Sequence, residues 1–141
     1  MKVVLASKNK HKWEEIRKIT EKLDIQLIME SDLGVDIDVE ETGTTFEVNS
    51  LQKARAVMEA TGLPALADDS GIAVDALNGE PGIYSARYGF DESLDDWGRL
   101  QLLLKNMENV PDDQRQGKFV CVITMISPSG VIMVITHTYF A

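Results

Sequence analysis

The stretch KVVLASKNKHKWEEIRKIT (residues 2–20) decides the fold class, because it passes from an apolar strand through a polar loop into an amphipathic helix. Residues 2–6 are short and mostly apolar, which predicts a buried strand, and residues 7–11 contain no apolar side chain. Apolar residues then recur at helical spacing among charged ones, which predicts a helix that packs one face on the core. These residues are Trp13, Ile16, Ile19 and Leu23.

Strands and helices continue to alternate after this unit. A second short strand is predicted at residues 26–29, and an acidic, irregular stretch follows at residues 32–39. A second helix is predicted to begin at Thr44, because Thr44 and Glu47 have the spacing of a capping box, and to end at Gly62.

Turn-forming residues dominate the next part of the chain. Residues 65–67 and 72–76 are predicted to be short strands on either side of a turn at residues 68–71 (DDSG). The sequence NGEPG at residues 78–82 predicts a loop, because glycine, proline and asparagine interrupt regular structure.

The last third of the chain predicts one helix and one hairpin. The helix is expected at about residues 94–109, with Ser93 as its cap. The residues expected to face the core are Leu94, Trp97, Leu100, Leu104 and Met107. Residues 118–127 and 131–140 read as long apolar strands, and the Pro-Ser-Gly sequence at 128–130 is typical of a hairpin turn.

This order of elements predicts an α/β fold with a mixed, twisted sheet and flanking helices. The 141 residues fit one domain spanning residues 1–141, and 44% hydrophobic with 26% charged residues is an ordinary globular balance. Residues 131–141 are nearly all apolar or β-forming, and a terminal strand is usually protected by polar residues or a further element. We therefore expect that a segment that once followed this strand is missing.

Charge and composition limit the possible functions. The formal net charge of −9 argues against binding of a nucleic-acid polymer, but a small phosphorylated ligand needs only a local cationic pocket or a carboxylate-bound metal. The single cysteine, Cys121, cannot form an internal disulfide and is predicted to be a buried thiol. No signal-like start or apolar run of membrane length is present, so we expect a cytoplasmic protein with no membrane partner.

The polar loop between the first strand and the first helix is a candidate phosphate site. It consists of Ser7, Lys8, Asn9, Lys10, His11 and Lys12. Unpaired N–H groups and the positive end of a helix dipole suit phosphate, and the lysines add positive charge. The alternative is a solvated turn in which Ser7 or Asn9 caps the helix, with His11 a surface residue.

Three further places carry charged groups that could take part in chemistry. Glu41 precedes the second helix, and its carboxylate suits a hard cation such as magnesium, although acidic residues near a helix N-terminus also occur without a ligand. Asp68 and Asp69 end a predicted strand, where α/β folds place their sites, with an Asx turn as the alternative. Lys53 lies within the second helix and by itself is a surface lysine.

Taken together, these segments resemble the inosine/xanthosine triphosphate pyrophosphatases, which remove non-canonical purine nucleotides. The matching segments are VVLASKNKHK (3–12), EETGTTFEVNSLQKA (40–54), ALADDSGIAVDALNGEPGIYSARY (65–88) and NVPDDQRQGKFVC (109–121). They occur in the order and spacing of that family and cover most of the chain. The resemblance implies a two-lobed fold with a central cleft, Mg²⁺-dependent release of pyrophosphate from ITP, dITP or XTP, and a homodimer with contacts at residues 81–88.

The resemblance also implies roles for single residues. The loop of residues 7–12 holds the triphosphate, chiefly through Asn9 and Lys12, and Lys53 neutralises further phosphate charge. Glu41 and Asp69 bind magnesium with Asp68 nearby. Asp69 also serves as the base for the attacking water, and Ser70 contacts the nucleotide.

The C-terminal part departs from the family pattern. The family continues with a Phe-Gly-Tyr-Asp-Pro-like segment and a Ser-His-Arg segment that read the purine, and neither occurs in these 141 residues. The second lobe is therefore expected to be incomplete. One alternative is a weak or inactive remnant that binds nucleotide phosphates or only dimerises, and a weaker one is a related pyrophosphatase for other nucleotides. Tyr139 and Phe140 could stack on a base, but an apolar strand is the simpler reading.

Overall fold

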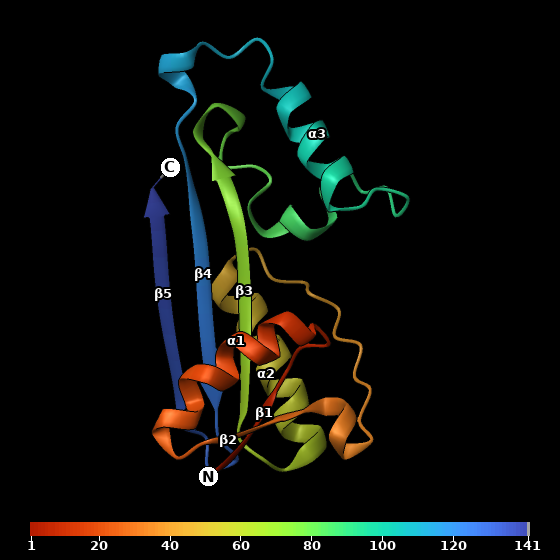
Figure 1. The fold of residues 1–141 in the computed structure, drawn as a ribbon, viewed down its shortest axis with the longest axis vertical. Coiled ribbons are helices and arrows are strands. Elements are labelled where there is room, and N and C mark those ends of the chain that lie inside the picture. Colours follow the sequence, from red (N-terminus) through yellow and green to blue (C-terminus); the bar gives the residue numbers. More distant parts are fainter. Residues whose placement is uncertain (141) are drawn as a thin grey trace. The chain divides into compact units, whose positions relative to one another are not determined.

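The computed structural model describes residues 1–140, which form a five-stranded sheet in the order β2-β1-β3-β4-β5 with helices beside it (Figure 1). The strands are β1 (Lys2–Leu5), β2 (Gln26–Met29), β3 (Ala65–Val74), β4 (Gly117–Ile126) and β5 (Ile132–Phe140). The α-helices are α1 (Lys10–Thr20), α2 (Phe46–Thr61) and α3 (Asp96–Asn106). Short 3₁₀ helices occur at Glu21–Leu23, Glu30–Leu33, Asp75–Leu77, Gly82–Arg87 and Asp112–Gln114.

The sheet is mixed, as predicted. β1 pairs in parallel with β2, from Lys2 opposite Gln26, and with β3, from Val4 opposite Ala65. β4 and β5 form the predicted hairpin, in which the Ser127 N–H donates to the Val131 carbonyl at 2.9 Å. The predicted α/β class with a mixed sheet is confirmed.

The described chain divides into two compact units. The first unit comprises Met1–Asp69 and Val122–Ile135, and the second comprises Ser70–Cys121 and residues 136–140. The first unit contains β1, β2, α1 and α2, and therefore every predicted site residue except Ser70.

The core of the first unit forms on both faces of β1. Val3 and Leu5 are buried with Trp13 and Ile16 of α1 against them, whereas Val4 is buried with Val57 of α2. Successive residues of a strand point to opposite faces of the sheet. The two helices therefore cover opposite faces of β1, as the wholly apolar sequence Val-Val-Leu requires of a central parallel strand.

Two of the four residues predicted to face the core from the first helix do not do so. Ile19 is 64% exposed and Leu23 is 61% exposed. The inner stripe of α1 passes instead through Trp13 and Ile16 to Thr20, which is buried. The spacing from Ile16 to Thr20 is one helical turn of four residues, so Ile19 falls beside the stripe, and α1 has ended before Leu23.

The turn predicted at residues 68–71 is wrong, because β3 continues without interruption from Ala65 to Val74. Asp68 and Asp69 are both buried within this strand. Carboxylates are costly at such positions unless cations accompany them, and their lysine partners come from distant parts of the chain. The local turn signal of the Asp-Asp-Ser-Gly sequence is thus overridden by tertiary contacts.

Further expectations fail in the second unit. α3 begins at Asp96 with Asp95 as its cap, whose side chain accepts from the Gly98 N–H, whereas Ser93 bonds to Asp91. Of the residues predicted to face the core, Met107 is buried, but Trp97, Leu100 and Leu104 are exposed. Cys121 is half-buried rather than buried. Within residues 1–140, no helix has the length and apolar character needed to span a membrane.

The apolar side chains noted in residues 131–140 are exposed on both faces of β5. The large apolar side chains of this strand are exposed at Ile132, Met133, Val134, Ile135 and Tyr139. Ala141 lies outside the described residues.

The cap of α2 provides a test of the fold. Thr45, rather than the predicted Thr44, caps α2, because its hydroxyl accepts from the Val48 N–H at 3.1 Å. We expect Thr45→Ala to lower the free energy of unfolding by about 1 kcal/mol. Thr44→Ala is the matched control and should change it by less than about 0.5 kcal/mol, because Thr44 is exposed. Urea denaturation measures both, and equal effects would contradict the assigned cap.

Candidate functional site

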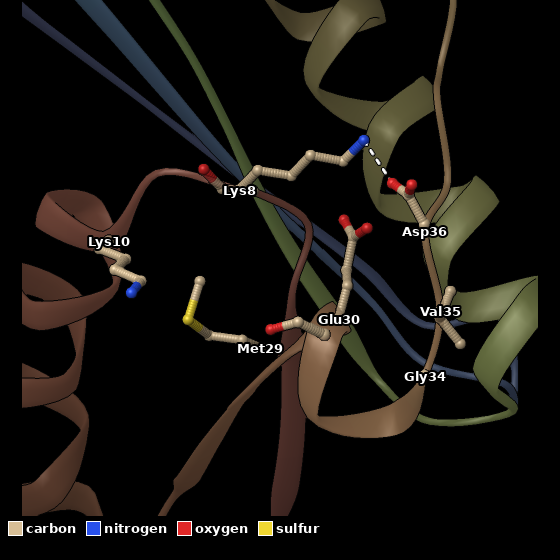
Figure 2. Close-up of a pocket in the computed structure, with 9 residues that line it drawn as sticks. Lys8, Lys10, Met29, Glu30, Gly34, Val35 and Asp36 are labelled. Carbon is tan, nitrogen blue, oxygen red and sulfur yellow. Dashed lines mark ion pairs between the residues drawn. The ribbon is translucent and has the colours of Figure 1, made fainter.

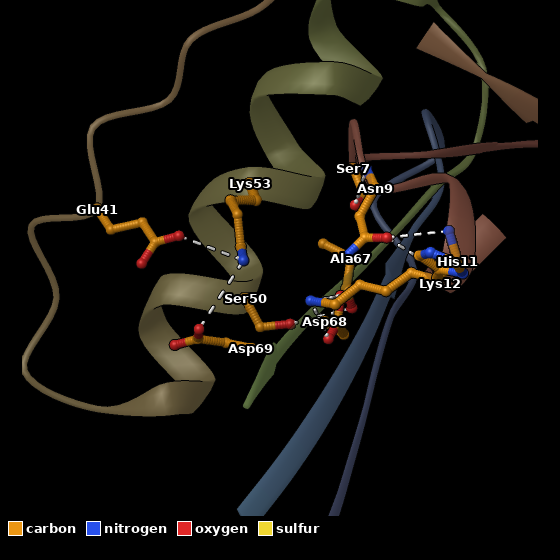
Figure 3. A network of polar contacts seen from close by, with 10 residues as sticks. All are labelled: Ser7, Asn9, His11, Lys12, Glu41, Ser50, Lys53, Ala67, Asp68 and Asp69. Carbon is orange, nitrogen blue, oxygen red and sulfur yellow. Dashed lines mark hydrogen bonds and ion pairs between the residues drawn. The ribbon is translucent and has the colours of Figure 1, made fainter. Parts of the chain in front are cut away.

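The first part of the site is a lysine that lies between two carboxylates. The Nζ of Lys53 is 3.3 Å from the Oε1 of Glu41 and 3.9 Å from the Oδ1 of Asp69 (Figure 3). The three residues come from α2, the loop before it and β3. The Lys53 side chain is 19% exposed, so it is not the surface lysine that its sequence context alone indicates.

The second part is the ion pair between Lys12 and Asp68. The Nζ of Lys12, in the first turns of α1, is 2.9 Å from Oδ2 and 3.2 Å from Oδ1 of Asp68. Asp68 and Asp69 are adjacent in β3, so their side chains point to opposite faces of the strand. This alternation gives one aspartate to the lysine of α1 and the other to the lysine of α2, as Figure 3 shows.

The loop before α1 is organised by Asn9. Its Oδ1 accepts from the N–H groups of His11 at 2.9 Å and Lys12 at 3.3 Å, and the Ser7 Oγ accepts from the Asn9 N–H at 3.1 Å. Asn9 is thus a helix cap, as the alternative interpretation of this loop predicted. Capping fixes the backbone from which Lys12 extends, so the structural role does not exclude a part in ligand binding.

Lys8 and Lys10 line a cavity near the site, and neither Asp68 nor Asp69 lines it. This cavity of about 420 Å³ is lined by both lysines, and the Nζ of Lys8 pairs with the Oδ1 of Asp36 at 2.5 Å (Figure 2). Glu30, which is 5% exposed, also lines it, and burial raises the pKa of Glu30 above its usual value. A second cavity of about 240 Å³ shares Lys8 and Glu30 and is bounded by Lys53, so cationic groups border both spaces.

Asp69 is the most perturbed carboxyl group of the site. Its pKa is raised from 3.8 to about 6, chiefly because burial disfavours the charged form and because Glu41 and Asp68 repel it. The cation of Lys53 and the side chain of Asn49 oppose this shift. The Oδ2 of Asp69 is buried and has no hydrogen-bond partner among residues 1–140, so one carboxylate oxygen is available to a ligand.

The two carboxylates beside Lys53 fit a divalent metal that phosphate and water also bind. Across residues 1–140, no group of three His, Cys, Asp or Glu side chains lies close enough to hold a metal without other ligands. Mg²⁺ in nucleotide sites needs one or two protein carboxylates, and phosphate oxygens and water complete its octahedral shell. Glu41 and Asp69, which share Lys53 as a partner, fit that requirement, and the unpartnered Oδ2 of Asp69 is a hard oxygen ligand.

The structure brings together most of the predicted site residues. Lys12, Glu41, Lys53, Asp68 and Asp69 meet in two linked ion-pair groups. His11 is exposed on the first turn of α1. Ser70 is exposed in β3 and belongs to the second unit, so its predicted contact with the nucleotide stays a prediction.

Two buried residues of α2 were not predicted from the sequence. Asn49 and Ser50 are both 0% exposed. Ser50 donates its Oγ–H to the Ala67 carbonyl at 3.2 Å, which attaches α2 to β3 directly before the two aspartates. Asn49 accepts from the Gly43 N–H at 2.8 Å. Their position one turn before Lys53 is the signal that could have identified them, because polar residues at i−4 and i−3 share its helix face.

The chain has relatives among known proteins. Its sequence matches the Ham1 family over residues 3–139. The chain belongs to the Ham1 family. The resemblance seen in the sequence is therefore confirmed.

Individual members of the Ham1 family match closely. A dITP/XTP pyrophosphatase of Shigella flexneri is 50% identical over 125 residues, which cover 89% of this chain and 62% of that protein. The Staphylococcus aureus Ham1 protein matches in structure with a TM-score of 0.88 at 41% identity, covering 99% of this chain and 70% of the other. A nucleoside-triphosphatase, dITP/XTP pyrophosphatase, of Mycobacterium abscessus matches with a TM-score of 0.86 at 38% identity, covering 99% and 73%.

The coverage differs between the two sides of these matches. The chain spans less than two thirds of the length of the first curated relatives, with 62% of the Shigella flexneri and Escherichia coli proteins covered. Family membership and fold follow from the matches.

The raised pKa of Asp69 makes stability depend on pH. Its folded-state pKa exceeds the unfolded value, so the folded protein binds the proton more tightly, and stability falls as pH rises from about 4 to about 6. Asp69→Asn stays neutral and avoids this loss. We therefore expect Asp69→Asn to gain on the order of 2 kcal/mol over the wild type between pH 4 and pH 7.5.

Urea denaturation in EDTA at several pH values measures this gain. Asp24→Asn is the matched control, because Asp24 has a left-handed backbone that asparagine tolerates and its side chain is exposed. A difference between Asp69→Asn and the wild type that does not change with pH would contradict the raised pKa.

Proposed function

We propose that this chain hydrolyses purine nucleoside triphosphates such as ITP, dITP and XTP to the monophosphate and pyrophosphate, with a divalent metal ion. The observation that carries the proposal is the placement of Lys53 between Glu41 and Asp69, with Lys12 on the adjacent Asp68. The relatives support the substrate class, because several are dITP/XTP pyrophosphatases.

Binding of the triphosphate falls to the lysines and the loop before α1. Lys12 pairs with the carboxylate of Asp68, with which a polyphosphate would compete for the lysine, and the Lys12 side chain is 38% exposed. The chain as a whole carries a net charge of −9, so attraction of a polyanion depends on local cations. We assign contacts with the phosphates to Lys12 and Lys53, and further contacts to Ser7, Lys8 and Asn9.

The metal is assigned to Glu41 and Asp69, with Asp68 beside them. Magnesium, when bound, supplies positive charge that stabilises the phosphoryl oxygens as negative charge develops on the leaving pyrophosphate. The choice of magnesium rests on the oxygen donors and on the phosphate ligand, which together suit a hard cation.

Proton transfer is assigned to Asp69. A general base must lie within reach of the attacking water, and the buried Oδ2 of Asp69 has no hydrogen-bond partner among residues 1–140. The oxygen of a water molecule bonds to the α-phosphorus, and the proton of this water passes to Asp69. The bond between the α-phosphorus and the bridging oxygen breaks, and pyrophosphate leaves with that oxygen. Lys53 lies within reach of Asp69 and keeps the carboxylate oriented before the water arrives.

The homodimer and the cytoplasmic location are parts of the same proposal. Residues 81–88 carry the exposed Tyr84, whose ring lies 5.4 Å from that of Phe90 and 5.1 Å from the Arg87 guanidinium carbon. Two exposed aromatic rings with an arginine beside them suit a protein contact. The choice between purine bases is left to experiment, because the segments that read the base in the family have no counterpart in residues 1–141.

Pyrophosphate release tests the proposed function. With Mg²⁺ and ITP, dITP, XTP, GTP or ATP as substrates, we expect the wild type to release pyrophosphate. Asp69→Asn should reduce the rate by at least about 100-fold, as expected for loss of a general base. Asp24→Asn is the control and should retain the wild-type rate.

The same assay separates the enzyme from the non-catalytic alternative. Triphosphate binding without pyrophosphate release in the wild type would establish a phosphate-binding remnant and refute the proposed hydrolysis.

Lys53→Ala tests the cationic role. We expect kcat/KM for ITP to fall on the order of 100-fold, because a positive charge next to the reacting phosphate is lost. Lys18→Ala, an exposed lysine of α1, is the control and should be neutral. Thermal denaturation checks folding, and a rate loss matched by a comparable loss of folded protein would count against the assigned role.

A further inference from the structure

Asn49 is a buried polar residue of α2 for which the proposed reaction has no assigned role. Its side chain is 0% exposed, and it lies four residues before Lys53 on the same face of the helix. Burial of an amide is costly unless both of its ends find partners. Both the carbonyl and the amide group of this side chain are therefore expected to have partners within the site.

The carbonyl end of Asn49 holds the loop that carries Glu41. Its Oδ1 accepts from the Gly43 N–H at 2.8 Å, two residues after Glu41. A Cβ on Gly43 would lie 2.6 Å from this oxygen and 2.5 Å from the Cγ1 of Val48. The loop can approach α2 this closely because residue 43 has no side chain.

The amide end of Asn49 lies near the other carboxylate. Its Nδ2 is buried without a hydrogen-bond partner in the described chain, and so is the Oδ2 of Asp69. The Asn49 side chain nevertheless lies near enough to Asp69 to favour its ionised form. A buried donor and a buried acceptor, each costly while unpaired, thus lie in the same neighbourhood.

We propose that Asn49 is a positioning residue that holds Glu41 through the Gly43 loop with its carbonyl and orients Asp69 with its amide. Both carboxylates then face the same ligand. This inference rests on the proposed function, because it assigns Asn49 to the support of the two proposed metal ligands. Side chains that orient metal ligands in this way commonly change metal affinity or activity 10- to 100-fold when they are replaced.

The first measurement is hydrogen exchange of the Gly43 amide, observed by NMR. Asn49→Leu keeps a similar volume but removes both ends of the amide, and we expect the Gly43 exchange rate to rise at least about 10-fold. Asn49→Asp retains an oxygen for the Gly43 N–H, so exchange should stay slow. Rapid exchange of the Gly43 amide in the wild type would overturn the carbonyl half of the inference.

The second measurement is Mn²⁺ affinity in the presence of pyrophosphate, followed by electron paramagnetic resonance. We expect Asn49→Leu to weaken Mn²⁺ binding by about 10- to 100-fold. Val122→Ala is the control for lost stability, because it removes buried volume from β4 at a residue that is 0% exposed and has no part in the site. It should leave Mn²⁺ affinity unchanged.

Kinetics with ITP separate positioning from substrate binding. We expect Asn49→Leu and Asn49→Asp to lower kcat at least about 10-fold with little change in KM, because Asn49 orients Asp69 without contacting the substrate. Full kcat in Asn49→Asp would overturn the amide half of the inference.

The outcomes also separate this inference from the proposed function. Failure of the wild type to bind Mn²⁺ and to release pyrophosphate would refute both. Normal wild-type behaviour, with Asn49→Leu indistinguishable from Val122→Ala, would refute only the positioning role of Asn49.

Discussion

The attraction between the Lys53 ammonium and the carboxylates of Glu41 and Asp69 is the interaction on which the site depends. Two carboxylates this close would repel each other, and burial of Asp69 adds a desolvation cost. Lys53 offsets part of that cost without removing it, since the pKa of Asp69 still rises to about 6. The site is therefore held in an electrostatically unfavourable state, as is common where a protein keeps groups ready for a ligand.

The alternation of side chains along β3 determines which helix each residue of the strand faces, in the site as well as in the core. Ala67 packs on the side of α2, whereas Leu66 packs on the side of α1. The same parity takes Asp69 to Lys53 and Asp68 to Lys12. A shift of one residue in the register of β3 would move both aspartates, and with them Leu66 and Ala67, to the opposite face of the sheet. The hydrophobic core and the charged site thus specify the same register.

Some local signals in the sequence predicted the structure correctly. Residues 26–29 were predicted as a strand with its observed bounds, and Gly62 ends α2 as predicted, because strand and cap patterns lie within a few residues. The turn predicted at residues 68–71 failed because the partner of Asp68 lies 56 residues away at Lys12. Asn49 was not predicted for a similar reason. Its partner is the backbone N–H of Gly43 in an irregular loop, and a contact with the backbone requires no particular side chain that could be recognised in the sequence.

Under the proposed function, the ion pairs of the site favour joint binding of the metal and the nucleotide. Each lysine is paired with a carboxylate, so a triphosphate that takes the lysines leaves Glu41, Asp68 and Asp69 without their cations. A divalent cation that takes the carboxylates in turn leaves the lysines without anions. Either ligand alone therefore breaks the ion pairs and leaves one set of charged side chains without a partner. When both ligands bind, the lysines pair with the phosphates and the carboxylates pair with the metal, so no charged group loses its partner. Such an exchange is a coupling free energy that favours joint binding of metal and nucleotide. It follows from charge placement alone, without any change of fold.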